Sequence, residues 1–193
     1  MSIYGVGTSH SPMAGYETRK TQKPARFQDS PNQMNNTVQT TQMASGTFEL
    51  HISNETDGES IGAICGSDHS MTVYKPKDFN PANPVYKVKV WDQDGNVTER
   101  MVDISKVDPK NSDYIDMFAY SSHLSASGEY PSALSDFTSG ASNQHGPDSR
   151  SYDDLFKSAN WISALREAMQ TQYDAHNIEG YWQYRRFLDF LEK

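Results

Sequence analysis

The stretch VYKVKVWDQDGNVTERMVDI, residues 85–104, predicts a β-hairpin, and this hairpin decides the fold class of the chain. Its first run alternates, so that Tyr86, Val88 and Val90 share one face of a strand and the intervening lysines share the other. The connection Asp92–Asn96 contains a Gly, which suits the left-handed backbone that tight turns require. The hairpin is therefore expected to be antiparallel, with one face directed towards a core.

Three earlier segments have the short, alternating or apolar character that is typical of strands. They are Thr47–Ser53, Ile61–Cys65 and Ser70–Tyr74. Turn residues separate them, and no stretch between them is long enough for the helical crossover that parallel neighbours need. Together with the hairpin, they predict an antiparallel sheet of about five strands over residues 47–104.

After the sheet, the periodicity of the apolar residues changes from that of strands to that of helices. Ser112 or Asp113 is suited to cap a first helix, which is expected to stop at Gly128. Pro131 suits the first turn of a second, short helix. Residues 138–150 are polar and without periodicity, so they are predicted to form a loop.

Ser151 and Asp154 have the spacing of a capping box and are predicted to open a long amphipathic helix, Tyr152–His176. Its buried stripe is expected to comprise Leu155, Ala159, Ile162, Leu165, Met169 and Tyr173. Asn177 is suited to the left-handed position that ends this helix. A last helix is predicted over Ile178–Leu191, so the chain is expected to end in a helical hairpin.

Strands first and helices after predict a single α+β domain over residues 47–193, with the C-terminal helices packed on the sheet. The preceding stretch, residues 1–46, contains 19 Ser, Thr, Asn or Gln, and its branched aliphatic residues are only Ile3, Val6 and Val38. So little apolar surface does not offset the entropy of ordering a chain. Residues 1–46, the N-terminal arm, are therefore predicted to be flexible and disordered.

The charge of the chain restricts the classes of partner that are expected. The formal net charge is −8, and because the arm carries +2, the rest of the chain carries −10. An acidic domain repels nucleic acid phosphates and anionic membrane surfaces, so neither nucleic acid nor a membrane is expected as a partner.

The compartment is predicted from the cysteine content and from the absence of targeting patterns. Cys65 is the only cysteine, so no intrachain disulfide is possible, as is usual in a reducing cytoplasm. The first residues lack the pattern of a secretory signal, and no apolar run is long enough to span a membrane. A cytoplasmic location is therefore expected. Export without a cleaved signal, with the arm as the secretion segment, stays open as an alternative.

One enzymatic alternative is a cysteine-dependent or other hydrolase built around Cys65, with His69 or His123 as the base. Asp68 and His69, with serines on either side, also supply the residue types of a hydrolase triad. However, Cys65 follows apolar strand residues, where a cysteine usually acts as a small buried hydrophobe. Adjacent turn residues do not converge as a triad must, so a non-enzymatic protein is the favoured interpretation.

No residue pattern calls for a metal or a cofactor. The six histidines do not fall at zinc-ligand spacings, and the glycines do not form a phosphate-binding loop. A weak calcium site at Asp92, Asp94 and Asn96 is the one alternative, because oxygen-bearing side chains cluster there. Turn formation accounts for the same residues more simply.

The last predicted helix carries more aromatic residues than one buried face can take. Its rings and the arginines beside them are Tyr181, Trp182, Tyr184, Arg185, Arg186, Phe187 and Phe190. Aromatic residues and Arg are enriched at the centres of protein interfaces. The sequence therefore predicts a binding module that uses this helix to contact a protein partner or a second copy of the chain. Burial of the rings in a deep groove between the sheet and the long helix stays open as the alternative.

Three segments carry a resemblance to a known group of proteins. They are VYKPKDFNPANPVYKVKVWDQDGNVTERMVDISKVDPKN, DLFKSANW and MQTQYDAHNIEGYWQYRRFLDFL, at residues 73–111, 154–161 and 169–191. Over residues 48–191 the chain resembles a group of small uncharacterised proteins from anaerobic Gram-positive bacteria. Since that group has no assigned activity, the resemblance implies a shared fold and supports the domain boundary, but it implies no catalytic residue.

Overall fold

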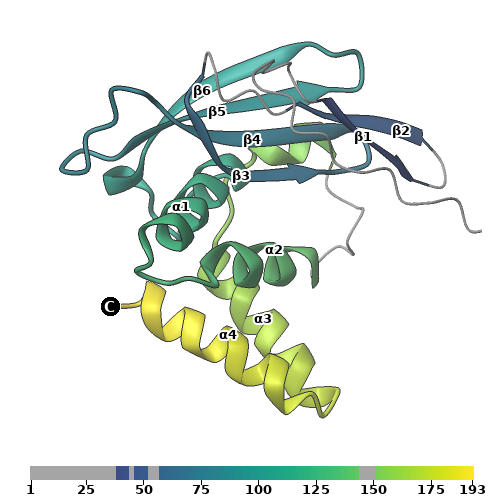
Figure 1. The fold of residues 1–193 in the computed structure, drawn as a ribbon. Coiled ribbons are helices and arrows are strands. Elements are labelled where there is room, and N and C mark those ends of the chain that lie inside the picture. The colour runs from purple at the N-terminus through teal and green to yellow at the C-terminus, as the bar shows by residue number, and fades with distance from the viewer. Residues whose placement is uncertain (1–37, 44–45, 52–56, 144–150) are drawn as a thin grey trace, which may run out of the picture. The chain divides into compact units, whose positions relative to one another are not determined.

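The computed structural model describes residues 38–43, 46–51, 57–143 and 151–193 of the chain (Figure 1). All of these residues belong to one compact unit, residues 34–193. Most of the predicted arm lies outside the described residues, so its disorder stays a prediction.

A four-stranded antiparallel sheet forms the first layer of this unit, in the order β3-β4-β5-β6. Its strands are β3 (Glu59–Cys65), β4 (His69–Lys75), β5 (Val85–Asp92) and β6 (Val97–Asp103). Strands that are neighbours in the sequence are also neighbours in the sheet. The predicted hairpin is confirmed as β5 and β6, with Gly95 at a φ of 80° where the chain turns.

The strand count differs from the prediction, because the sheet has four strands and not five. The predicted first strand falls on β2 (Gly46–His51), which pairs with β1 (Val38–Met43) in a separate two-stranded sheet. β1 itself lies in the stretch that was predicted as the end of the arm. A bulge in β3 between Ser60 and Gly62 shifts its register, and such bulges disrupt the straight edge that a further strand would need.

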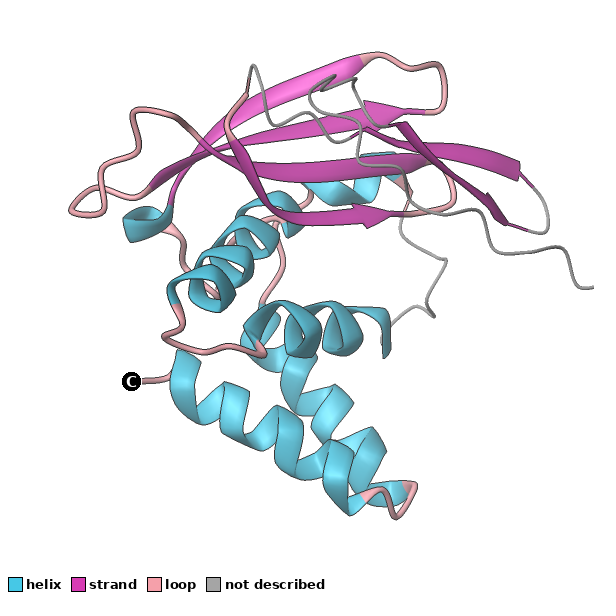
Figure 2. Cartoon of the chain, viewed as in Figure 1, coloured by secondary structure: helices cyan, strands magenta, loops and turns pink. Residues whose placement is uncertain are grey.

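The helices gather on one side of the four-stranded sheet, as the α+β prediction expected (Figure 2). They are η1 (Ile104–Lys106), α1 (Tyr114–Ser127), α2 (Ala133–Asn143), η2 (Tyr152–Phe156), α3 (Trp161–Asp174) and α4 (Ile178–Leu191). α1 lies against β3 and β5, and the core between sheet and helices includes Val88, Ile115 and Phe118, all fully buried. α3 and α4 form the predicted helical hairpin.

Local signals set the two ends of α1 as predicted. The Asp113 side chain accepts a hydrogen bond of 2.9 Å from the Asp116 amide and so caps the first turn. Gly128 ends the helix in the left-handed conformation, with a φ of 79°. On the sheet side of α1, a Cβ at Gly62 would lie 2.3 Å from Ser122 Oγ, so glycine is what allows this close approach.

Residues 138–143 were wrongly predicted to be loop, since they form the second half of α2. Their hydroxyl groups bond back to the helix itself: Thr138 Oγ1 donates to the Leu134 carbonyl at 2.8 Å, and Ser142 Oγ donates to the Thr138 carbonyl at 2.7 Å. Ala141 is buried in the core on the same stretch. Residues 144–150 lie outside the described part of the chain.

The long helix predicted over Tyr152–His176 is wrong as a single element. The capping box is present, with the Ser151 amide donating to Asp154, but it opens only the short η2. The chain then runs extended to Ala159, which forms an isolated antiparallel bridge with Ser112. The side chain of Asn160 caps α3 as a separate helix.

The left-handed residue between α3 and α4 is His176, with a φ of 58°, and not Asn177 as predicted. Asn177 instead caps α4, because its side-chain oxygen accepts from the Gly180 amide at 3.1 Å. The predicted bounds of the last helix, Ile178–Leu191, are confirmed.

Replacing Gly62 by Ala is expected to destabilise the domain by about 1–3 kcal/mol, because the new methyl group would press α1 away from the sheet. Chemical unfolding of Gly62→Ala measures the loss. The double variant Gly62→Ala/Ser122→Ala should recover most of it, since the obstructing hydroxyl is then gone. An unchanged unfolding midpoint in Gly62→Ala would contradict the close packing described for α1.

Candidate functional site

The five rings of α4 divide between the core and the surface. Tyr184 and Phe187 are buried, with exposed fractions of 4% and 0%. Phe190 is half-buried, and its ring centroid lies 5.2 Å from that of Tyr130. The remaining two rings, Tyr181 and Trp182, lie near the beginning of the helix and do not enter the main core.

Tyr181 and Trp182 belong to a cluster of exposed apolar residues at the tip of the α3–α4 hairpin. Trp182, Ile178 and Tyr173 are 51%, 53% and 55% exposed, and Tyr181 is half-buried between rings. The Tyr181 centroid lies 5.7 Å from that of Tyr173 and 5.4 Å from that of Trp182. We call these four residues the tip patch.

Helix periodicity explains why the tip patch forms. Ile178 precedes Tyr181 and Trp182 by three and four positions, so the three share one face of α4. Tyr173 joins them from the last turn of α3. The sequence pattern had placed Tyr173 in the buried stripe of its helix, and this was wrong because the stripe leaves the core before the end of α3.

Hydrogen bonds hold the connection between α3 and α4. Asn177 Nδ2 donates to Gln172 Oε1 at 2.7 Å, and the Asn177 amide donates to the Gln172 carbonyl at 2.9 Å. Gly180 is buried against Gln172 and Asn177, where a Cβ would come within 2.8 Å of either side chain. The tip patch is therefore displayed on a tight, preorganised turn.

The two predicted arginines of α4 are both exposed. Arg185 Nε donates to Asp189 Oδ1 at 3.3 Å, and Arg185 Nη1 donates to the Tyr181 hydroxyl at 3.4 Å. Arg185 thus orients a ring of the tip patch while its own charge is balanced by Asp189. Arg186 follows Trp182 by four positions and so lies one turn further along the same face of α4.

The structure does not bring Cys65 together with His69 or His123. Cys65 pairs with Ser70 across β3 and β4, and the alternation of strand side chains puts both on the face away from the helices. His69 precedes Ser70 in β4 and points to the helix side, where His123 also lies, on α1. Burial raises the pKa of the Cys65 thiol, which disfavours the thiolate that a nucleophile needs.

Asp68 and His69 form a hydrogen bond, but this bond has a structural role. His69 Nδ1 lies 2.7 Å from Asp68 Oδ1, and the imidazole is 3% exposed. The other carboxylate oxygen of Asp68 accepts from the Tyr152 amide at 3.0 Å. The pair therefore fastens the β3–β4 turn to η2. Ser70 lies on the opposite face of β4, so no triad forms with it.

His123 joins α1 to the sheet through Tyr86. The Tyr86 hydroxyl and His123 Nδ1 lie 2.9 Å apart, and His123 Nε2 lies 3.8 Å from a carboxylate oxygen of Glu129. Burial, and secondarily the charge of Glu129, raise the pKa of Tyr86 to about 12. Burial also lowers the pKa of His123, against the opposing effect of Glu129. The favoured forms are therefore a neutral phenol and a neutral imidazole.

The residues of the weak calcium alternative are engaged in the β5–β6 turn. Asp92 Oδ1 accepts from the amides of Asp94 and Asn96 at 2.9 and 2.8 Å, and Asp92 Oδ2 accepts from Asn96 Nδ2 at 2.9 Å. Among the described residues, no group of three or more His, Cys, Asp or Glu side chains is placed to hold a metal ion.

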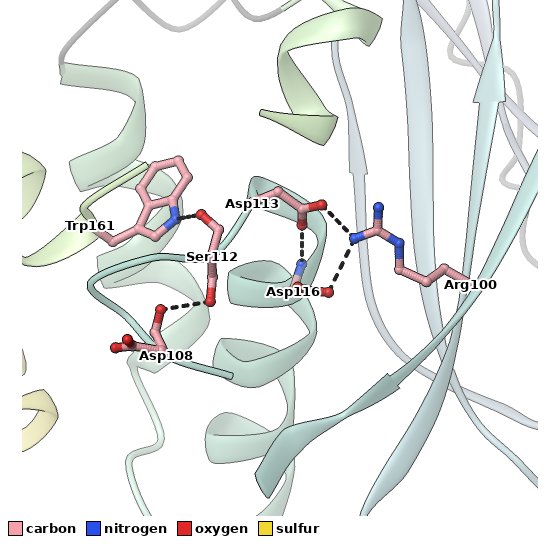
Figure 3. Close-up of polar contacts among 6 residues, drawn as sticks. All are labelled: Arg100, Asp108, Ser112, Asp113, Asp116 and Trp161. Atoms are coloured by element: carbon pink, nitrogen blue, oxygen red, sulfur yellow. Dashed lines mark hydrogen bonds and ion pairs between the residues drawn. The ribbon is translucent and has the colours of Figure 1, made fainter. Parts of the chain in front are cut away.

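A polar network between the layers was not anticipated from the sequence (Figure 3). Arg100 Nη1, from β6, donates to Asp113 at 2.5 Å and to Asp116 at 3.2 Å. Burial, followed by the charge of Asp113, raises the pKa of Asp116, although Arg100 opposes this. The alternation of side chains along β6 could have indicated this network, because it puts Arg100 on the same face as the buried Val102.

None of the helices in the described part of the chain combines the length and apolarity that crossing a membrane requires. Comparison with known protein families, curated proteins and solved structures gave no match. The resemblance to a bacterial group therefore stays a prediction, and the candidate site is defined by the geometry of this chain alone.

Acidification should weaken the fold through His123. Because its pKa is lowered in the folded state, protons bind more readily to the unfolded chain, and stability falls as the pH drops through the ordinary range of histidine. In His123→Asn an amide oxygen takes the place of Nδ1 and nothing titrates. Lowering the pH from 7.5 to 5.5 should therefore reduce the free energy of unfolding of His123→Asn by less than that of the unchanged protein.

The exposed His176, replaced by Asn in the same way, is the matched control for this measurement. Its backbone is left-handed, and Asn tolerates that conformation well. An equal loss of stability on acidification in His123→Asn and in the unchanged protein would contradict the role given to His123.

Proposed function

We propose that this chain is a non-enzymatic protein-binding module and that the tip patch is its contact surface. One observation carries the proposal: three large side chains, Tyr173, Ile178 and Trp182, are each more than half exposed at a single hydrogen-bonded turn. Apolar residues scattered singly over a surface need no explanation, but a contiguous aromatic cluster is typical of interaction sites.

The composition and rigidity of the tip patch support binding. Tyr and Trp are the residues most enriched at the energetic centres of interfaces, since they offer large contact areas with few rotatable bonds. In the tip patch the Tyr181 ring lies between Tyr173 and Trp182, and Arg185 holds its hydroxyl. Side chains that are already ordered lose less entropy when a partner covers them.

The two alternatives have less support. A hydrolase centred on Cys65 would need a base beside the thiol, and both His69 and His123 are directed to the other side of the sheet. An exported factor would depend on residues 1–37 of the arm, which lie outside the described part of the chain. The binding module is therefore the function that the geometry favours.

Site-specific photo-crosslinking tests the proposal. A benzophenone amino acid replaces the exposed Ala175, beside the tip patch, or the exposed Met101 on β6 as the control position. After irradiation in an extract of the native cells, the Ala175 position should give a discrete cross-linked product that the Met101 position does not give. Combining the label with Tyr173→Ser and Trp182→Ser should remove that product, since each such residue contributes about 1–3 kcal/mol to a typical interface.

Both serine variants remove exposed side chains, so circular dichroism should confirm an unchanged fold. A product with twice the mass of the chain would identify self-association in place of a different partner. The proposal is contradicted if no product forms at Ala175, if both label positions give the same product, or if the serine variants leave it unchanged.

A further inference from the structure

The tip patch has a border of negative charge. Asp174 ends α3 and Glu179 lies in the first turn of α4, and both are exposed. Asp174 accepts a hydrogen bond of 2.8 Å from Gln170, a neutral side chain that leaves the negative charge in place. Between residues 167 and 184 the sequence contains no Lys or Arg.

Two of the three arginines that flank the tip in the sequence are engaged within the hairpin, and the third, Arg186, is exposed one turn beyond Trp182. Arg166 pairs with Glu192, and Arg185 pairs with Asp189. The segment between residues 167 and 184 therefore carries a negative formal charge, in keeping with the net charge of −8 of the whole chain. A partner whose binding surface is also acidic would be repelled as it approached.

The size of the tip patch restricts the partner further. A large side chain has about 200 Å² of surface. The four residues of the tip patch, each about half exposed or less, therefore offer roughly 300–400 Å² of apolar surface in total. A stable dimer or other standard interface needs about 800 Å² from each partner. The tip patch alone is therefore too small for a second copy of this chain, but it matches one face of a short helix.

We infer that the occupant of the tip patch is a short, basic, amphipathic helical segment of a partner protein. Its apolar face covers Tyr173, Ile178 and Trp182, and its Lys or Arg side chains lie opposite Asp174 and Glu179. This inference rests on the proposed function and adds the chemistry of the partner. It requires two separable contributions to binding, one from the rings and one from the two carboxylates.

Two synthetic helical peptides with the same leucine face serve as probes. One carries lysines on its polar face and the other carries glutamines, so that they differ only in charge. Each is fluorescently labelled and titrated with the full chain, and fluorescence anisotropy measures binding. The lysine peptide should bind about threefold to tenfold more tightly than the glutamine peptide at low salt and should lose this advantage at high salt.

Variants of the full chain separate the two contributions. Trp182→Ser should weaken binding of the lysine peptide at least tenfold. Asp174→Asn/Glu179→Gln should weaken it by about threefold to tenfold, as expected for two exposed ion pairs. The matched control, Asp78→Asn/Asp94→Asn, removes two exposed charges from the sheet region and should change binding less than twofold.

The remaining outcomes distinguish a failure of the inferred basic partner from a failure of the proposed binding surface. Equal binding of both peptides, lost in Trp182→Ser, would overturn the basic partner but leave the proposed binding surface intact. If neither peptide binds, or if Trp182→Ser binds the lysine peptide as well as the unchanged chain, the inference is overturned. A photo-crosslinked partner at Ala175 would then show that the proposed function survives with an occupant of different chemistry.

Discussion

Two adjacent residues, Ser112 and Asp113, hold the two layers of this domain together (Figure 3). The Ser112 carbonyl accepts both the Ala159 amide, at 2.9 Å, and the indole N–H of the buried Trp161, at 2.8 Å. Asp113 caps α1 and binds Arg100 on β6. Sheet, first helix and C-terminal hairpin therefore meet at one point, and a buried indole N–H without a partner would be costly.

The position of the tip patch follows from this junction. Because Ala159 is held in a bridge with Ser112, the chain cannot continue as a helix from η2, and α3 begins anew at Trp161. α4 then returns along α3, placing Tyr184 and Phe187 in the core and leaving Ile178 and Trp182 at the surface. The rings of the tip patch are therefore exposed because the bridge to Ser112 fixes the other end of the α3–α4 hairpin in the core.

The sequence predicted those elements whose determinants are local. The β5–β6 hairpin needs only its own alternation and Gly95, and α1 needs only its cap at Asp113 and its stop at Gly128. The break before α3 was missed because a long-range bridge to Ser112 overrides a continuous helical pattern. The surplus of rings on α4 indicated a surface, but the contribution of Tyr173 depends on where α3 leaves the core, which no local pattern encodes.

A double-mutant cycle between Arg100→Met and Asp113→Asn tests the junction most directly. Asn retains an oxygen that can cap α1 but removes the charge that faces Arg100. If the ion pair joins the layers, the free energies of unfolding should show a coupling of about 1–3 kcal/mol between the two sites. Effects that add to within about 0.5 kcal/mol would contradict the account.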